Sequence, residues 1–146
     1  MISQFTTPDL VKRIDGGKFD KAEYREKPEE YIDTFKENLD LVSWLVNGIY
    51  WEAKYPRILS KEDMRKSVEK GDTKFMGLTD ISADYEGSVE FTSRFTSIEE
   101  PFLLYDPIKS DFKEKISEMG SQDILFHSVD HLPAEMPKEA SNHFGS

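Results

Sequence analysis

A short apolar run that ends in two carboxylates constrains the fold of this chain more than any other stretch. The run extends from Phe75 to Leu78, Asp80 and Asp84 follow it four residues apart, and Gly87 then breaks the segment. A short continuous apolar run is typical of a buried parallel strand. Open α/β sheets bind ligands just beyond the carboxyl ends of such strands. The sequence therefore predicts an α/β fold with working groups at this strand end.

Size and charge exclude several kinds of partner. The chain has 146 residues, the length of one domain, with a formal net charge of −10. Nucleic acids and anionic membranes require a basic face, so neither is expected as a partner. No apolar run reaches the length of a membrane-spanning helix, and the first ten residues lack the pattern of a secretory signal. With no Cys, and with three His that are too few and wrongly spaced for a metal cluster, no metal site is expected.

Strand-like and helical patterns alternate along the chain. Strands are expected at 41–46, 74–80 and 124–129, and strand-like runs at 89–95 and 102–105. Helices are expected at 28–38, at 60–70, weakly at 112–119, and from about 138, with an irregular connection at 6–27. This alternation predicts a parallel sheet with helices packed on it.

Three of the predicted strands end in polar breaks. These are Asn47-Gly48, Asp80 to Asp84, and Asp130-His131. In a parallel sheet all three ends meet at one edge, which is how a cofactor crevice is built. Strand ends are also polar simply because loops are exposed. Both interpretations stay open from the pattern alone.

Single residues near these breaks also have two interpretations. Asp84 could be a general base or a carboxylate that fixes a substrate amine, but a turn before Gly87 is the commoner use of such a residue. Asp80 is expected to position the loop backbone. His131 could bind a ribose or a substrate, or it could simply be solvated. Three aromatic residues could line a pocket or serve only in packing: Tyr50, Trp51 and Tyr55.

Three motifs follow one another in a specific order. They are Val46-Asn47-Gly48-Ile49-Tyr50-Trp51-Glu52 with Pro56-Arg57-Ile58-Leu59, then Asp80-Ile81-Ser82-Ala83-Asp84 through Gly87-Ser88-Val89-Glu90-Phe91, then Ser128-Val129-Asp130-His131-Leu132-Pro133. In this order they resemble the lysine-ketoglutarate reductase half of alpha-aminoadipic semialdehyde synthase, and the resemblance covers nearly the whole chain. Fungal saccharopine dehydrogenase and alanine dehydrogenase are more distantly similar.

The resemblance implies a fold and a reaction. The reductase joins the ε-amine of L-lysine to the ketone of 2-oxoglutarate, and a hydride from NADPH reduces the imine to saccharopine in lysine degradation. Residues 1–146 would then be the C-terminal part of a Rossmann-like nucleotide-binding domain, a three-layer parallel sheet with helices on its faces. From about residue 124 the chain would return toward the substrate domain. An animal-like parent enzyme would lie in the mitochondrial matrix, and another parent in the cytoplasm.

The resemblance also assigns roles to residues. Asn47, Gly48, Ile49 and Tyr50 would lie along the dinucleotide, and Ser82 and Ala83 would approach the nicotinamide. Two further residues would lie against the nicotinamide: His131 and Leu132. The animal reductases carry Asn where this chain has His131, whereas the fungal dehydrogenases carry His. The catalytic residue would be Asp84, which falls where alanine dehydrogenase has an active-site aspartate. A carboxylate near the reacting nitrogen would hold a cationic amine or iminium.

Two parts of the family's machinery are not found in this sequence. The glycine-rich turn of the nucleotide domain and the lysine–histidine acid–base pair would lie elsewhere in the parent enzyme. The isolated chain is therefore expected to bind NADP(H) weakly and to have no reductase activity without the remaining reductase domain. The alternative is a non-catalytic module that docks on the full-length reductase or regulates it. A weaker third possibility is a small domain of unrelated function.

Overall fold

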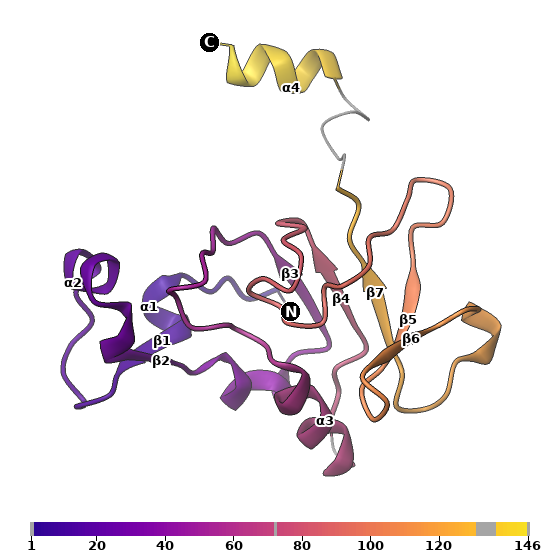
Figure 1. The fold of residues 1–146 in the computed structure, drawn as a ribbon, viewed down its shortest axis with the longest axis horizontal. Coiled ribbons are helices and arrows are strands. Elements are labelled where there is room, and N and C mark those ends of the chain that lie inside the picture. Colours follow the sequence, from indigo (N-terminus) through magenta and orange to yellow (C-terminus); the bar gives the residue numbers. More distant parts are fainter. Residues whose placement is uncertain (1, 72, 131–136, 146) are drawn as a thin grey trace.

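The protein is built around a five-stranded mixed sheet. The computed structural model describes residues 2–71, 73–130 and 137–145. The strand order is β3-β4-β7-β5-β6 (Figure 1). The strands are β3 (Trp44–Asn47), β4 (Gly77–Asp80), β5 (Leu103–Asp106), β6 (Asp111–Lys113) and β7 (Ile124–His127). β3, β4 and β7 are parallel, whereas β5 is antiparallel to both of its neighbours. The three expected parallel strands are confirmed, but the sheet as a whole is not parallel.

The antiparallel half arises from a turn that the sequence interpretation missed. The Asp106 carboxylate accepts hydrogen bonds from the backbone N–H groups of Ile108 and Lys109, both at 3.0 Å. This turn leads β6 back along β5, so the weak helix expected at 112–119 is wrong. Phe112 instead packs against Phe126 in the core, with ring centroids 5.2 Å apart. Only a single 3-10 turn, η3 (Ile116–Glu118), follows β6.

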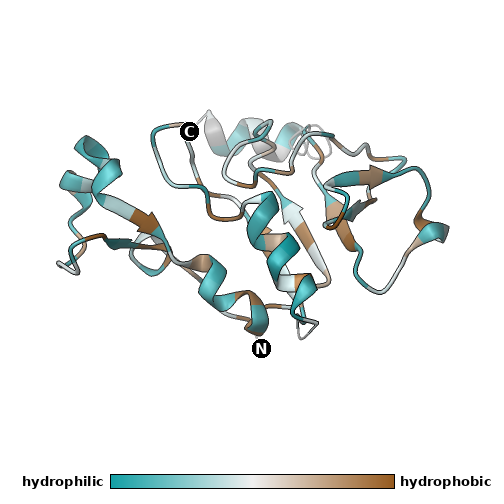
Figure 2. Ribbon diagram, turned by 60° about the horizontal axis from the view of Figure 1, so that its bottom comes forward, coloured by the Kyte–Doolittle hydropathy of each residue, from teal (hydrophilic) through white to brown (hydrophobic). Residues whose placement is uncertain are grey.

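Helix α3 (Lys61–Glu69) confirms the helix expected at 60–70. The Ser60 hydroxyl accepts from the Asp63 backbone N–H, and the Asp63 carboxylate accepts in return, which forms a capping box. Gly71 ends the segment with a φ of 80°, a conformation that glycine adopts freely. Met64 and Val68 pack into the core that also holds Leu78 of β4. Figure 2 shows α3 in front of β4 with mostly hydrophilic residues along its visible side.

An N-terminal unit flanks β3 at the opposite end of the molecule from β6 (Figure 1). It consists of α1 (Thr7–Leu10), β1 (Val11–Arg13), α2 (Lys21–Glu26), η1 (Pro28–Glu30), β2 (Tyr31–Asp33) and η2 (Phe35–Leu41). The single helix expected at 28–38 is not formed: the 3-10 helices η1 and η2 occupy its two ends, but between them Tyr31 pairs with Arg13 and Asp33 with Val11 in an antiparallel ladder. The expected irregular connection at 6–27 is wrong, because α1, β1 and α2 all lie within it. Pairing between distant segments overrides the local helical spacing here.

Two further segments complete the fold. The run at 89–95 forms no strand, and isolated bridges join Val89 to Leu59 and Thr96 to Val129. Its Phe91 stacks on Tyr105 with ring centroids 4.4 Å apart. Helix α4 (Pro137–Phe144) lies apart from the sheet in Figure 1, so a three-layer arrangement stays a prediction. Within the described residues, no helix has the length and apolar character needed to cross a membrane.

Candidate functional site

The carboxyl ends of the three parallel strands meet at one edge of the sheet. Asn47 at the end of β3 lies opposite Asp80 at the end of β4, and its Nδ2 donates to Asp80 Oδ1 at 2.8 Å. Ser128, directly after β7, donates from Oγ to the backbone oxygen of Asp80 at 3.1 Å. The three strand ends therefore converge around Asp80, although His131 of the third polar break lies outside the described residues.

Asp80 is a buried carboxylate with three side-chain donors. It is 1% exposed, and besides Asn47 it accepts from Ser82 Oγ and Thr92 Oγ1, each at 2.6 Å. Asn47 also donates to Ser88 Oγ at 2.9 Å. Hydrogen bonds to an ionised acceptor are strong, and buried networks of them hold one geometry. Asp80 therefore positions the loop that follows β4, which is the structural role expected for it.

The loop after β4 closes in a tight and strained turn. The Gly87 backbone N–H donates to the Asp84 carbonyl at 3.0 Å, so the turn expected at Asp84 is present. Ala83 and Glu86 have φ angles of 49° and 45°, in the left-handed region that side chains disfavour. A Cβ on Gly87 would lie 2.5 Å from Asp84 Cβ. Such backbone strain persists only where the surrounding structure holds it, often at functional sites.

Arg57 holds this strained turn from the opposite side. Its Nε donates to the Gly87 carbonyl at 3.0 Å and its Nη2 to the Glu86 carbonyl at 2.9 Å. The backbone N–H of Ile58 donates to the Ser88 carbonyl at 2.9 Å. The sequence interpretation gave Arg57 no role. The available signal was its position in the motif Pro56-Arg57-Ile58-Leu59, since a conformationally fixed turn needs such donors.

The Asp84 carboxylate takes no part in this bonding. Its backbone makes the turn, but its half-buried side chain forms no hydrogen bond or ion pair with any residue that the structure describes. Burial, and then the charge of Asp80, raises the pKa of Asp84 above its usual range. A carboxylate with a raised pKa and no partner can accept a proton or hold a cationic group.

The other predicted site residues are only partly brought together. Ser82 and Ala83 are half-buried in the loop, and Gly48 beside Asn47 is exposed, with no heavy atom within 4 Å of an added Cβ. Ile49 lines two cavities, one of which Asn47 also lines, whereas Tyr50 lines the other and is 79% exposed. His131 and Leu132 lie outside the described residues. Within those residues, no group of three or more His, Cys, Asp or Glu could hold a metal ion.

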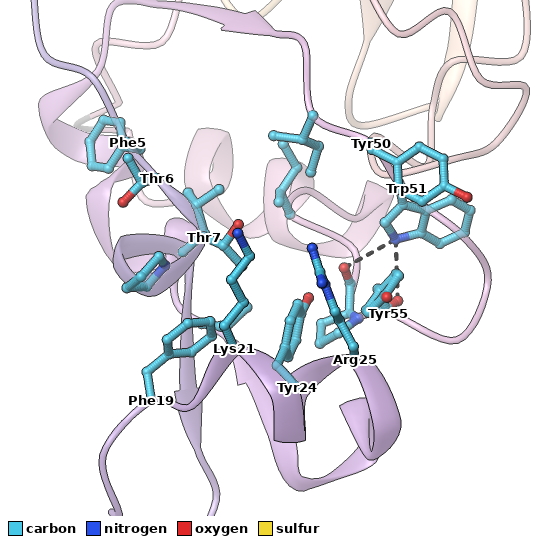
Figure 3. A pocket seen from close by; sticks show the side chains of 16 residues that line it. Phe5, Thr6, Thr7, Phe19, Lys21, Tyr24, Arg25, Tyr50, Trp51 and Tyr55 are labelled. Carbon is cyan, nitrogen blue, oxygen red and sulfur yellow. Dashed lines mark hydrogen bonds between the residues drawn. The ribbon is translucent and has the colours of Figure 1, made fainter.

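Two cavities lie beside β3 and the segment after it, and neither is lined by the Asp84 loop. One, of about 660 Å³, runs along β3 and includes Asn47. The other, of about 550 Å³, lies in the N-terminal unit, and Tyr50, Trp51 and Tyr55 line it (Figure 3). Both uses left open for these aromatic residues are therefore present, because they line this cavity and Tyr55 also packs on Tyr24. The loop with Asp84 therefore lines neither of these cavities.

Comparison with known proteins identifies relatives of this chain, although no protein-family model matches it. It is 39% identical over 142 residues to alpha-aminoadipic semialdehyde synthase of Arabidopsis thaliana, covering 96% of this chain and 13% of that protein. The mitochondrial alpha-aminoadipic semialdehyde synthases of Bos taurus and Rattus norvegicus are 36% and 37% identical over 152 residues. These matches cover 93% of this chain and 16% of each relative. The chain is therefore homologous to one segment of alpha-aminoadipic semialdehyde synthase.

Proposed function

We propose that this chain contributes part of the active site of a lysine-ketoglutarate reductase. That enzyme reduces the imine of L-lysine and 2-oxoglutarate to saccharopine in lysine degradation. Homology to alpha-aminoadipic semialdehyde synthase supports the proposal. The observation that carries it is Asp84, a half-buried carboxylate without a partner among the described residues, with a raised pKa, on a loop held rigidly at the ends of parallel strands.

In this proposal the residues of the sheet edge bind and orient the reactants. The Asp84 carboxylate holds the cationic amine or iminium, because opposite charges a few ångströms apart in a partly buried site attract strongly. Asp80 and Arg57 keep the Asp84 turn in one conformation through the bonds described above. Fixed groups need no reorganisation when charge develops in the transition state. Asp84 is thus the catalytic residue, and Asp80 and Arg57 are positioning residues.

The residues present fit only one end of a dinucleotide. At the end of β3, Gly48 leaves open space where an added Cβ would meet nothing within 4 Å, so an extended ligand could approach the backbone there. NADP(H), when bound, supplies the hydride. Asn47 and Gly48 would lie along it, and Ser82 and Ala83 would approach its nicotinamide. We propose that the pyrophosphate site and the acid–base groups belong to the remaining reductase domain, so the isolated chain is inactive.

The names of the animal relatives bear on the compartment. Those of Bos taurus and Rattus norvegicus are called mitochondrial, whereas that of Arabidopsis thaliana is not. We propose the mitochondrial matrix for an animal-like parent and the cytoplasm otherwise.

The proposal is tested in a reductase whose own segment is replaced by residues 1–146 of this chain. NADPH oxidation is measured with L-lysine and 2-oxoglutarate. Asp84→Asn is expected to lower kcat by about 10²-fold or more, the size typical for loss of a charged catalytic group. Glu99→Gln, which removes one exposed carboxylate elsewhere, is the control and should leave kcat unchanged. Full activity of Asp84→Asn would contradict the proposal, and NADPH oxidation by the isolated chain would contradict its inactivity.

A specific surface favours the second candidate function, a module that docks on the full-length reductase. β3 is the last strand of the sheet, so no described strand pairs with its outer edge. Val46 of this strand is 60% exposed, and the cavity of about 660 Å³ runs alongside it. An open apolar strand edge readily pairs with another chain. Co-elution with full-length reductase is therefore expected, and Val46→Lys should abolish it, whereas Ile98→Lys on another exposed surface should not.

A further inference from the structure

The cavity of the N-terminal unit has the walls of a small-molecule site. Its volume of about 550 Å³ lies within the range of ligand pockets. The aromatic residues of its lining are Phe5, Phe19, Tyr24, Tyr50, Trp51 and Tyr55. Figure 3 shows Tyr24, Trp51 and Tyr55 close together at one side of the cavity, with Lys21 and Arg25 extending past the Tyr24 ring. Flat rings and two cations therefore face the same space.

The charge of this lining is opposite to that of the whole chain. The chain carries 29 Asp and Glu against 19 Lys and Arg, yet none of the 16 lining residues is Asp or Glu. The two charged residues of the lining are Lys21 and Arg25, four positions apart on α2. Like charges at this spacing repel each other. Both side chains are exposed, and an anion between them would relieve this repulsion.

Neither cation is neutralised within the part of the chain that the structure describes. No hydrogen bond or ion pair joins Lys21 or Arg25 to a described side chain. Arg13 of the neighbouring β1 differs, because it forms ion pairs with Asp15, at 2.8 Å, and with Glu23. The carboxylates of this unit therefore pair with Arg13, and the two cations at the cavity can still bind an anion.

The aromatic wall is already fixed in place. The Trp51 indole Nε1 donates to the carbonyls of Tyr55 and Pro56 at 3.2 and 3.1 Å, and the Arg57 guanidinium lies 5.4 Å from its ring centroid. The Tyr24 and Tyr55 rings lie 5.0 Å apart at an interplanar angle of 32°. Rigid aromatic side chains bind planar ligands at low cost in conformational entropy.

We propose that this cavity binds a small anion that carries a planar aromatic or heteroaromatic ring. The ring packs against the wall of Tyr24 and Trp51, and a carboxylate or phosphate lies between Lys21 and Arg25. Arginine suits either anion because its guanidinium forms two parallel hydrogen bonds with it. The proposal does not depend on the reductase function, because it requires neither hydride transfer nor the Asp84 loop.

The test is an NMR titration of the chain, residues 1–146, which follows its two indole N–H signals. The probes are 2-naphthoate and adenosine 5′-monophosphate, and their neutral counterparts are 2-naphthamide and adenosine. We expect the Trp51 signal to shift with at least one anion, which then identifies carboxylate or phosphate as the preferred group. The Trp44 signal should stay in place, because its Nε1 donates to Thr79 on the sheet, outside this cavity.

Matched variants separate the site from non-specific attraction. Lys21→Gln with Arg25→Gln should weaken binding by about tenfold or more, since charge-assisted hydrogen bonds are lost. Lys18→Gln with Lys27→Gln removes two exposed charges outside the cavity and should change binding less than about twofold. Asp84→Asn should leave binding unchanged. The proposal is overturned if no anion binds at millimolar concentration, if the neutral counterparts bind equally well, or if both double variants weaken binding alike.

Discussion

The sheet edge and the N-terminal unit each bury one carboxylate, and they hold it in different ways. Asp80, at the edge, is 1% exposed and accepts hydrogen bonds from three side chains. Asp33, on β2 of the N-terminal unit, is 9% exposed, and Oδ1 accepts from the backbone N–H of Phe35 at 3.0 Å. Burial raises the pKa of Asp33 to about 6. The Asp80 carboxylate is thus satisfied by several hydrogen bonds, whereas the Asp33 carboxylate has lost water without gaining as many partners.

Asp80 thus stabilises the structure around it through hydrogen bonds, whereas the buried charge of Asp33 destabilises it. At the sheet edge, donors from β3, the loop after β4 and the segment after it converge on one side chain, so removal of that side chain leaves several groups unsatisfied. In the N-terminal unit the ionised carboxylate itself is the unfavourable group. Loss of the carboxylate should therefore lower the free energy of unfolding at Asp80 and raise it at Asp33.

The largest expected effect is the loss of Asp80. Asp80→Ala leaves donors of Asn47, Ser82 and Thr92 without their acceptor, and two of these residues are fully buried. We expect the free energy of unfolding to fall by about 3–5 kcal/mol, as for other broken buried networks. Urea denaturation of the variant and the parent chain measures this difference.

Ser82→Ala is the control for that experiment. Ser82 is half-buried, so its neighbours can reach water, and its loss should lower stability by about 1 kcal/mol or less. If Asp80→Ala were no more destabilising than Ser82→Ala, the network would not be what holds the loop.

The elements that could be predicted from the sequence are those with a local signal. The strand before Asp80 is a continuous apolar run, and the helix of residues 60–70 begins at a capping box of Ser60 and Asp63. Tyr31 and Phe35 have helical spacing, yet Tyr31 lies in β2, because it pairs with Arg13 of β1, which is distant in the sequence. That partner contributes nothing to a local pattern, so the strand pair could not be predicted.

Some residues of the candidate site could likewise be predicted from the sequence and others could not. Asn47 directly follows a predicted strand, Asp80 ends one, and Asp84 lies four residues beyond it, so the place of these residues near the edge could be predicted. Thr92 bonds Asp80 from 12 positions away, and Arg57 bonds Glu86 from 29 positions away. Such contacts depend on how loops fold over one another, which neither periodicity nor turn chemistry encodes.

A smaller effect, of opposite sign, is expected at Asp33. Because the pKa of Asp33 rises from 3.8 to about 6 on folding, the folded chain binds this proton more tightly than the unfolded chain. Stability therefore falls as pH rises from about 4 to about 6 and stays constant above that. Asp33→Asn removes the charge and should stabilise the chain at pH 7 by about 1–3 kcal/mol.

Thermal or urea unfolding of both proteins between pH 4 and pH 7 measures this effect. The advantage of Asp33→Asn should vanish near pH 4, where the carboxyl group is protonated in the folded chain. An advantage that is equal at both pH values would show that the effect does not come from the ionised form.

The smallest expected effect on stability is at Asp84, four residues from the most sensitive position. Its carboxylate has no partner among the described residues, and its pKa is raised by burial and by Asp80. Asp84→Asn therefore breaks no bond and removes an unfavourable charge, so the unfolding free energy should change by less than about 0.5 kcal/mol at pH 7. Urea denaturation beside Asp80→Ala measures it. A loss of several kcal/mol would make Asp84 a structural residue like Asp80, whereas an unchanged stability together with a large loss of kcat in the reductase would assign it to the chemistry.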